Sequence, residues 1–167
     1  MATYTLDLEA VSCDELYADI TSVLRQSGLT PAEFATHLKQ IIFNKTQCNA
    51  SVGMGPNMLM ARLATKKAKP NGLFYINKKD MNEFMKDHKI EDLPGVGRSM
   101  AHRFHGMGIR TCTEMQKVCI FVAFKKFQKY VTVFLKIRSA WESSNKNLVK
   151  SKVKHCIICA GGKTNAL

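Results

Sequence analysis

Two adjacent carboxylates, Asp14 and Glu15, are of the residue type that holds a metal ion. They follow a stretch, Thr3 to Val11, whose loose alternation of apolar and polar residues is typical of a half-buried strand. Carboxylates at a strand end commonly bind Mg²⁺, and two-metal phosphoryl transfer needs a bridging carboxylate. A second interpretation stays open, in which Asp14 caps a helix that begins near Leu16 and Glu15 lies near the positive end of its dipole.

A fixed ammonium group is the second feature that could do chemistry. No Asp or Glu occurs from Phe34 to Ile76, whereas six lysines and arginines do, and the last of them, Lys69, stands directly before Pro70. An ammonium held in such surroundings is suited to neutralising the triphosphate of a nucleotide. The alternative is that Lys69 is an ordinary solvated surface lysine.

The third feature is a glycine-containing hairpin, Leu93 to Gly97, between two helical stretches. This pattern is typical of a helix-hairpin-helix. Glycines let the backbone approach a phosphate closely, and the start of the next helix favours an anion. We therefore expect phosphate contacts from Gly95 and from Gly97, Arg98, Ser99 and Met100, which would position nucleic acid without reading its sequence. The alternative is a plain tight turn between packed helices.

The elements that position these residues can be outlined from periodicity. Helical spacing of apolar residues runs from Leu16 to Val23 and Leu24, and Gly28 ends that helix. A capping box, Thr30 to Glu33, starts the next helix, expected over 31 to 44. Short strands are expected at 48 to 53 and 73 to 76, and helices at 58 to 67 and 78 to 89. The pattern predicts an α+β fold, with a mixed sheet backed by helices in residues 1 to 76 and a wholly helical chain beyond.

Composition limits the classes of function. The 167 residues carry a formal net charge of +12, a surplus that favours polyanionic partners. Residues 1 to 116 account for only +2 of this charge and residues 117 to 167 for +10. With 46% hydrophobic and 23% charged residues the chain is of globular composition. No apolar run approaches the roughly 20 residues of a membrane helix, and the start lacks a signal-peptide pattern, so we expect no membrane partner and reduced cysteines.

Taken in order, these motifs resemble the Y-family translesion DNA polymerases. The resemblance covers about residues 3 to 117, and within the family it is most similar to the Rev-type deoxycytidyl transferases of eukaryotes, which are DNA repair proteins. The segments that carry it are Ser12-Cys13-Asp14-Glu15, Ala50 to Asn57 with Leu59, Ala61 and Ala64, Lys69-Pro70-Asn71-Gly72 and Leu93 to Gly97.

The resemblance implies a division of labour. Asp14 and Glu15 would be two of the three catalytic carboxylates that bind Mg²⁺ in the palm, Lys69 would contact the incoming triphosphate, and the hairpin at 93 to 97 would grip DNA from the thumb. The implied partners are primer-template DNA and a deoxynucleoside triphosphate, dCTP if the chain is Rev-type. Other translesion polymerase subunits are further candidates with no residues assigned to them, and the implied location is the nucleus.

The same resemblance sets the expected domains. Residues 1–76 would be the C-terminal half of the palm, 77–117 a thumb segment with the helix-hairpin-helix, and 118–167 an unassigned basic tail in which phenylalanines from 121 to 134 fall at helical spacings. The family's first metal-binding strand and its fingers have no counterpart. Asp7 and Glu9 are the only upstream carboxylates, and we expect them to face solvent away from the metals.

Three hypotheses about function follow. The first is a segment of a Y-family polymerase or deoxycytidyl transferase acting in translesion synthesis, impaired because one metal carboxylate and the fingers are missing. The second is a non-catalytic DNA-binding module that uses the hairpin and the basic tail. The third is a chain that folds poorly because half of its sheet is absent. The first two predict salt-sensitive, sequence-tolerant DNA binding with little or no primer extension.

Overall fold

The computed structural model describes residues 1–86, 88–117, 135, 139 and 156–160. The chain divides into two compact units. We call Met1–Lys78 together with Lys150–Leu167 the sheet unit, and Lys79–Val149 the hairpin unit. Across the described ranges, every helix is too short or too polar to span a bilayer.

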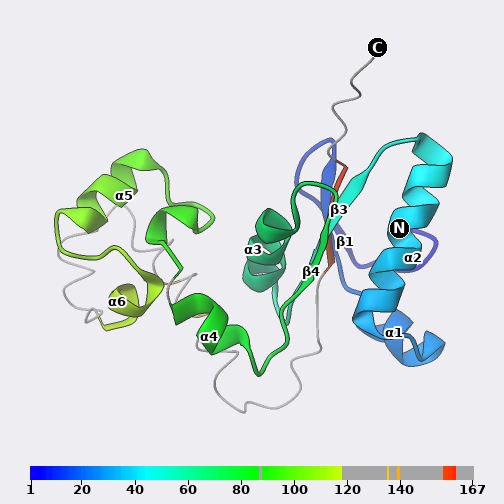
Figure 1. Ribbon diagram of the computed structural model, residues 1–167, viewed down its shortest axis with the longest axis horizontal. Coiled ribbons are helices and arrows are strands. Elements are labelled where there is room, and N and C mark those ends of the chain that lie inside the picture. The colour runs from blue at the N-terminus through cyan, green and yellow to red at the C-terminus, as the bar shows by residue number, and fades with distance from the viewer. Residues whose placement is uncertain (87, 118–134, 136–138, 140–155, 161–167) are drawn as a thin grey trace. The chain divides into compact units, whose positions relative to one another are not determined.

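A five-stranded mixed sheet organises the sheet unit (Figure 1). Its strands lie in the order β1-β2-β5-β3-β4. Antiparallel pairing joins β1 to β2, β2 to β5 and β5 to β3, whereas β3 and β4 are parallel. The strands are β1 (Leu8–Ala10), β2 (Glu15–Ala18), β3 (Ala50–Met54), β4 (Leu73–Tyr75) and β5 (Cys156–Ala160).

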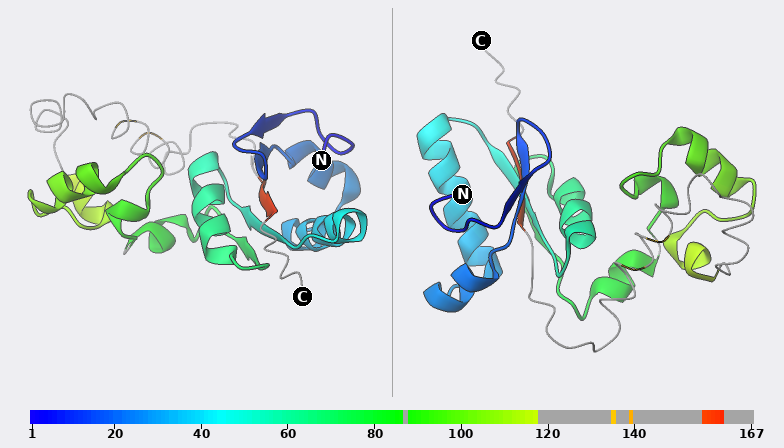
Figure 2. Two further views of the ribbon diagram at one scale, coloured as in Figure 1. Left: turned by 90° about the horizontal axis from the view of Figure 1, so that it is seen from above. Right: turned by 180° about the vertical axis from the view of Figure 1, so that it is seen from behind.

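Helices cover both faces of this sheet. Helices α1 (Thr21–Ser27) and α2 (Pro31–Thr46) lie on one face, and α3 (Met58–Ala68) lies on the other, as the right-hand view of Figure 2 shows. Side chains from β2, β3 and α2 form the main apolar cluster, with Phe34, Leu38 and Val52 at most 2% exposed. The prediction of a mixed α+β fold is confirmed. A sheet buried on both faces also explains why β3 consists entirely of buried residues.

The expected helix starting near Leu16 is wrong over its first residues. Residues 15 to 18 form strand β2, and α1 begins only at Thr21, where Asp19 Oδ1 accepts a hydrogen bond of 2.9 Å from the Thr21 backbone N–H. The backbone of β2 pairs with a strand on each side, and this long-range pairing outweighs the local helical spacing. Asp14 therefore caps no helix. Gly28 does end α1, in the left-handed conformation with φ 69°.

Helix α2 begins as its sequence predicts. The Thr30 side chain accepts from the backbone N–H of Glu33, and the Glu33 carboxylate accepts from the backbone N–H of Thr30, so the capping box is complete. The Thr30 hydroxyl also donates to Glu33 Oε2 at 2.7 Å, and this bond and the one from the Thr30 N–H hold the pKa of Glu33 below its usual value. This local motif involves four consecutive residues and needs no tertiary partner.

Strand β5 is the feature that periodicity did not predict. The expectation of a wholly helical chain beyond residue 76 is wrong, because residues 156 to 160 form a strand between β2 and β3. Ile158 is the register partner of Leu16 on one side and of Val52 on the other. A strand that is paired along both edges satisfies all of its backbone groups, which stabilises an otherwise short segment.

The hairpin unit is helical in its described part. It contains α4 (Met81–Lys86), a 3₁₀ helix η1 (Ile90–Asp92), α5 (Arg98–His105) and α6 (Cys112–Lys117), and an isolated bridge joins Lys89 to Thr111. Its buried side chains include Ile90, Leu93 and Phe104. The helical spacing noted for residues 121 to 134 lies outside the described residues.

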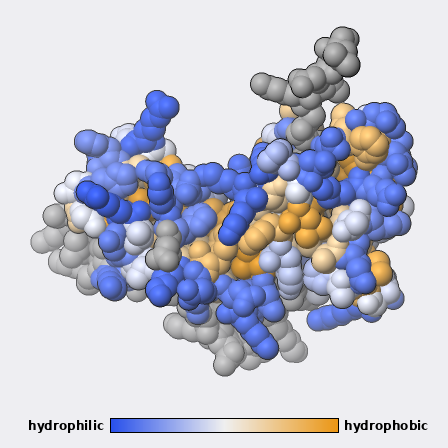
Figure 3. Space-filling view, in the orientation of Figure 1, coloured by the Kyte–Doolittle hydropathy of each residue, from blue (hydrophilic) through white to orange (hydrophobic). Residues whose placement is uncertain are grey.

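The face seen in Figure 3 is mainly hydrophilic, and its larger apolar patches lie over the sheet unit.

Candidate metal, nucleotide and nucleic-acid sites

A tight hairpin between β1 and β2 presents the two carboxylates. The carbonyl of Glu15 accepts hydrogen bonds from the backbone N–H groups of Val11 and Ser12, at 2.9 and 3.1 Å, which closes the turn. Asp14 lies in this turn, and Glu15 is the first residue of β2. Because the backbone turns between them, the two side chains are freed from the strict alternation of a regular strand.

Asp14 is exposed and held by Ser12. The Ser12 hydroxyl donates to Asp14 Oδ1 at 2.6 Å, and the Asp14 backbone N–H points back to Ser12 Oγ at 3.4 Å. The Ser12 hydrogen bond is the main cause that lowers the pKa of Asp14, and the positive charge of Lys69 lowers this pKa further. Asp14 is therefore ionised at neutral pH and open to a cation from solvent.

Glu15 lies between two cationic side chains, that of Arg62 in α3 and that of Lys69, which directly follows α3. Its Oε1 is 3.3 Å from Lys69 Nζ and its Oε2 is 3.5 Å from Arg62 Nη1. The Glu15 side chain is only 19% exposed, against 38% for Arg62 and 50% for Lys69. The partly buried carboxylate thus has one cation close to each oxygen.

Helix α3 brings these cations to Glu15 because it packs directly on the sheet. A Cβ on Gly53 of β3 would fall 2.0 Å from Thr65 N, so only glycine allows this approach. Asn57 caps the helix by accepting from the Met60 backbone N–H at 2.9 Å. Arg62 and Lys69 are seven residues apart, two helical turns, so they lie on one side of α3.

The turn after α3 fixes the backbone of Lys69. Lys69 ends the helix in an extended conformation, as expected for the residue before a proline. Asn71 follows with φ 46°, its carbonyl accepts a hydrogen bond from the ammonium of Lys39, and the Gly72 N–H donates to the Ala68 carbonyl at 2.7 Å. The ammonium of Lys69 therefore projects from an anchored turn.

The two carboxylates are suitable ligands for Mg²⁺, but their small number limits how tightly they can hold it. Mg²⁺ is held in proteins by one or two carboxylates, water and substrate phosphates, and Asp14 and Glu15 supply two carboxylates beside Lys69. Among the residues whose positions are described, no group of three or more His, Cys, Asp and Glu side chains is arranged to hold a metal. The residues therefore fit a weak, largely hydrated ion that substrate phosphates complete.

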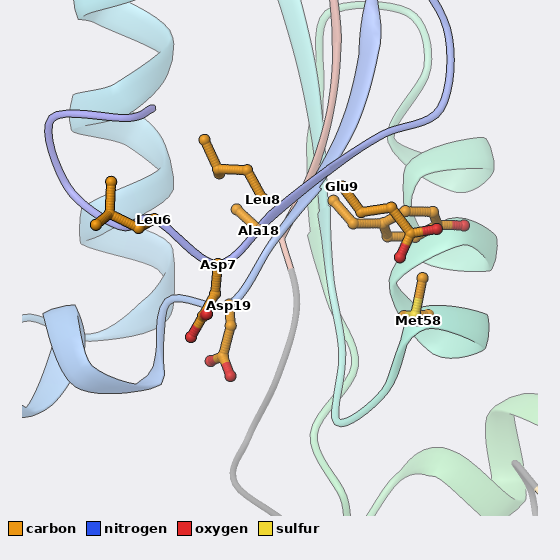
Figure 4. Close-up of a pocket in the computed structure, with 8 residues that line it drawn as sticks. Leu6, Asp7, Leu8, Glu9, Ala18, Asp19 and Met58 are labelled. Carbon is orange, nitrogen blue, oxygen red and sulfur yellow. The ribbon is translucent and has the colours of Figure 1, made fainter.

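The upstream carboxylates lie elsewhere on the same hairpin. The backbone carbonyl of Asp7 accepts a hydrogen bond from the Asp19 N–H at the end of the hairpin opposite Asp14, about 13 Å away at roughly 3.3 Å per strand residue. Figure 4 shows Asp7 beside Asp19 at that end, and Glu9 farther along the hairpin, nearer to Met58. These side chains line a separate surface pocket with Leu6, Leu8, Tyr17 and Ala18. Asp7 therefore does not join Asp14.

The hairpin unit presents the glycine turn on its surface. Gly95 has φ 85°, a left-handed conformation that favours glycine, whereas Gly97 has φ −84° and open space where a Cβ would be. Leu93 and Val96 are buried, which anchors the turn, and Gly95, Gly97, Arg98 and Ser99 are exposed.

Helix α5 starts directly after this turn. Gly97 is its N-cap and offers no side-chain cap. The first N–H groups of a helix lack intrahelical acceptors, so those of Arg98, Ser99 and Met100 are oriented to meet an anion. Met100 is 4% exposed, so its side chain packs inward and only its backbone is suited to such a contact.

Two side chains of the site were not singled out from sequence. Ser12 could have been found from its spacing, because a serine two residues before an aspartate often hydrogen-bonds it locally. Arg62 could have been found from its position two turns before Lys69 on α3. Their partners, in contrast, depend on the sheet: Arg62 and Glu15 are 47 residues apart in the chain.

The sequence matches known protein families and relatives, and these matches agree with the arrangement described above. Residues 1–66 match the impB/mucB/samB family and residues 91–130 match the DNA polymerase-iota thumb domain. The chain is 38% identical to the DNA repair protein Rev1 of Drosophila melanogaster over 72% of its length, and 34% identical to the DNA polymerase IV of Shigella flexneri over 84%.

Solved structures give the same result. The structure described as a Dbh ternary complex superposes with a TM-score of 0.73 at 27% identity over 84% of the chain, and DinB from Sulfolobus solfataricus with 0.72 at 26%. The chain spans 12% of that Rev1, 38% of that polymerase IV and 42% of the Dbh chain. A palm-like α+β region followed by a thumb segment is thus common to these proteins and to this sequence. The chain belongs to the Y family of DNA polymerases, of which it is a palm and thumb segment.

Proposed function

We propose that this chain is the part of a translesion DNA polymerase that holds the metal ion, the incoming nucleotide and the DNA backbone. The main support for this proposal is that two carboxylates, Asp14 and Glu15, lie close to the ammonium of Lys69, which comes from a distant segment of the sheet unit. Carboxylates beside a phosphate-binding cation are what nucleotidyl transfer requires.

Each residue has a role in this proposal. Asp14 and Glu15 hold Mg²⁺, and Lys69 Nζ neutralises the triphosphate of a deoxynucleoside triphosphate. The Mg²⁺ that these carboxylates would hold would lower the pKa of the attacking hydroxyl and stabilise charge on the phosphates. In the transfer itself the primer 3′-hydroxyl gives its proton to water, its oxygen forms a bond to the α-phosphorus, and the bond from the α-phosphorus to the pyrophosphate oxygen breaks. Because these residues act by position and charge, the arrangement of β2 and α3 matters more than any single group.

The hairpin supplies the contact with DNA. Gly95, Gly97, Arg98, Ser99 and Met100 bind phosphates of primer-template DNA through backbone N–H groups and the Arg98 guanidinium. Such contacts depend on salt and tolerate any sequence.

We expect little or no primer extension from this chain alone, because the described part of the sheet brings no third carboxylate to Asp14 and Glu15. The proposal also includes three finer parts: a Rev-type preference for dCTP, a nuclear location and contacts with other translesion polymerase subunits. Rev1 and polymerase IV proteins both match the chain, and only the match to Rev1 supports the dCTP preference.

Primer extension with Mg²⁺ and each of the four nucleotides tests the impairment. Robust insertion that is lost in Asp14→Ala would contradict it, and selective dCMP insertion would establish the Rev-type preference. A gel shift with the same primer-template tests the DNA contact. Absence of salt-sensitive binding would contradict the role of the hairpin.

A second function, a non-catalytic DNA-binding module, is favoured by one observation: the hairpin belongs to a compact unit separate from the carboxylates. This alternative predicts that Asp14→Ala leaves both DNA affinity and nucleotide binding unchanged. Binding of dCTP that requires Lys69 distinguishes the first function from it.

A further inference from the structure

The Glu15 carboxylate is already neutralised by protein groups. Arg62 Nη1 and Lys69 Nζ each lie close to a different oxygen, at 3.5 and 3.3 Å. A divalent cation that binds Glu15 must compete with these two positive charges. Asp14, in contrast, is exposed and is held chiefly by the uncharged Ser12 hydroxyl.

The two cations differ in how they are held. Arg62 also hydrogen-bonds the hydroxyl of Tyr17, a neighbour on β2 that packs against Ala61. Lys69 has an anchored backbone but a side chain that is 50% exposed, and its charge also acts on Asp14. The Lys69 ammonium can therefore move away from Glu15 by rotation of its own side chain, whereas Arg62 stays fixed by Tyr17.

We propose that Arg62 and Lys69 form a cation clamp on Glu15, which a divalent cation opens by displacing the Lys69 ammonium. This inference rests on the proposed function and deepens it. In the open state the ammonium is released for a nucleotide phosphate, so divalent cation and phosphate bind cooperatively. Arg62 is a positioning residue that holds the Glu15 carboxylate in place in both states.

The size of the effect follows from the exposure of the clamp. Partly exposed ion pairs contribute about 0.2 to 1 kcal/mol each, equivalent to roughly a 1.4- to fivefold change in affinity. Removal of the Lys69 ammonium should thus tighten binding of a divalent cation by about two- to fivefold at low ionic strength. Salt should reduce the difference.

Mn²⁺ is the probe, and the electron paramagnetic resonance signal of free Mn²⁺ measures its binding to the full chain. Lys69→Ala is expected to tighten Mn²⁺ binding, and Arg62→Ala to do so less, because Glu15 then loses its orientation. Arg62→Lys should restore the wild-type affinity. Lys67→Ala is the matched control, because Lys67 lies in the same last turn of α3 but places its ammonium over the Phe74 ring, 4.8 Å from the centroid.

A second measurement follows the ammonium itself. The side-chain NMR signal of Lys69, assigned through Lys69→Arg, should shift as Mg²⁺ is added, and that of Lys67 should not. A shift at both lysines or at neither would overturn the clamp, as would unchanged or weaker Mn²⁺ binding in Lys69→Ala or equal tightening in Lys67→Ala.

The failure of the clamp can be separated from the failure of the proposed function by Asp14→Ala. If wild-type Mn²⁺ binding does not depend on Asp14, or is absent, the metal site itself is wrong and the clamp with it. If binding depends on Asp14 but the Lys69→Ala and Arg62→Ala variants bind like the wild type, only the clamp is wrong.

Discussion

The sheet unit and the hairpin unit assemble their candidate sites in opposite ways. In the sheet unit, Glu15 meets Arg62 and Lys69 across 47 and 54 residues of sequence, and these contacts exist only when the sheet is formed. In the hairpin unit, consecutive residues from Gly95 to Met100 supply backbone groups from one turn and one helix start. A site of distant side chains therefore depends on the whole fold, whereas a site of adjacent backbone groups depends on local conformation.

The largest expected difference between the units comes from Ile158→Pro. A proline at the centre of β5 removes one N–H from a doubly paired strand and leaves a partner carbonyl unsatisfied, a loss of roughly 2 to 4 kcal/mol. Hydrogen exchange should accelerate at Val52 and Tyr17 of the sheet unit and stay slow at Phe104 of the hairpin unit. Urea denaturation gives the free energy of unfolding.

Thr164→Pro provides the control for this experiment, because position 164 lies beyond β5. Equal exchange rates in Ile158→Pro and Thr164→Pro would mean that β5 is not needed by the sheet. Faster exchange in both units would mean that their folding is coupled, and would contradict the independence of the hairpin unit from the sheet.

The next effect concerns DNA affinity. Gly97→Asp combined with Arg98→Ala puts a negative charge at the start of α5 and removes an exposed cation, so we expect at least roughly tenfold weaker binding, the equivalent of one charge-assisted hydrogen bond. The slope of affinity against salt should also decrease. Gel shifts at several salt concentrations measure both quantities, and unchanged affinity would remove the role of the hairpin.

A smaller effect is expected for the cap of α3. Asn57→Ala removes the acceptor of the Met60 N–H and should lower the free energy of unfolding of the sheet unit by about 1 kcal/mol. Asn57→Ser retains an acceptor and is the conservative control. Equal stability of the alanine and serine variants in urea denaturation would show that the cap contributes nothing.

The smallest effect is a shift in the titration of Asp14. The pKa of Asp14 is depressed chiefly by Ser12, so the interactions that favour its ionised form are present above the unfolded-state pKa and are lost as pH falls through the folded-state pKa. Ser12→Ala should raise this pKa toward its ordinary value near 3.8, and NMR titration of the carboxyl carbon measures it. An unchanged pKa would show that Ser12 does not hold Asp14.

The difference between local and distant contacts also explains what the sequence could predict. The capping box of α2 and the left-handed Gly28 are set by neighbouring residues and were predicted at their positions. Leu16, Ile20, Val23 and Leu24 fit helical spacing, yet residues 15 to 18 form β2 because two strands flank them. Strand β5 was missed because its partners lie more than 100 residues away in the chain.

The candidate site divides along the same line. Asp14, Glu15 and Lys69 were selected by residue type and motif, and the structure brings them together on the sheet unit. That Arg62 would share Glu15 with Lys69 required the register of β2 and the packing of α3 on Gly53. Side-chain partners across a sheet are set by tertiary packing, which a periodic pattern does not specify.

Anomalous diffraction from crystals of the full chain soaked with Mn²⁺ and dCTP locates the metal ion and the triphosphate in one experiment. We expect an anomalous peak within coordinating distance of Asp14 and Glu15, with Lys69 Nζ on the triphosphate rather than on Glu15. A peak elsewhere, or a triphosphate bound away from Lys69, would contradict this expectation.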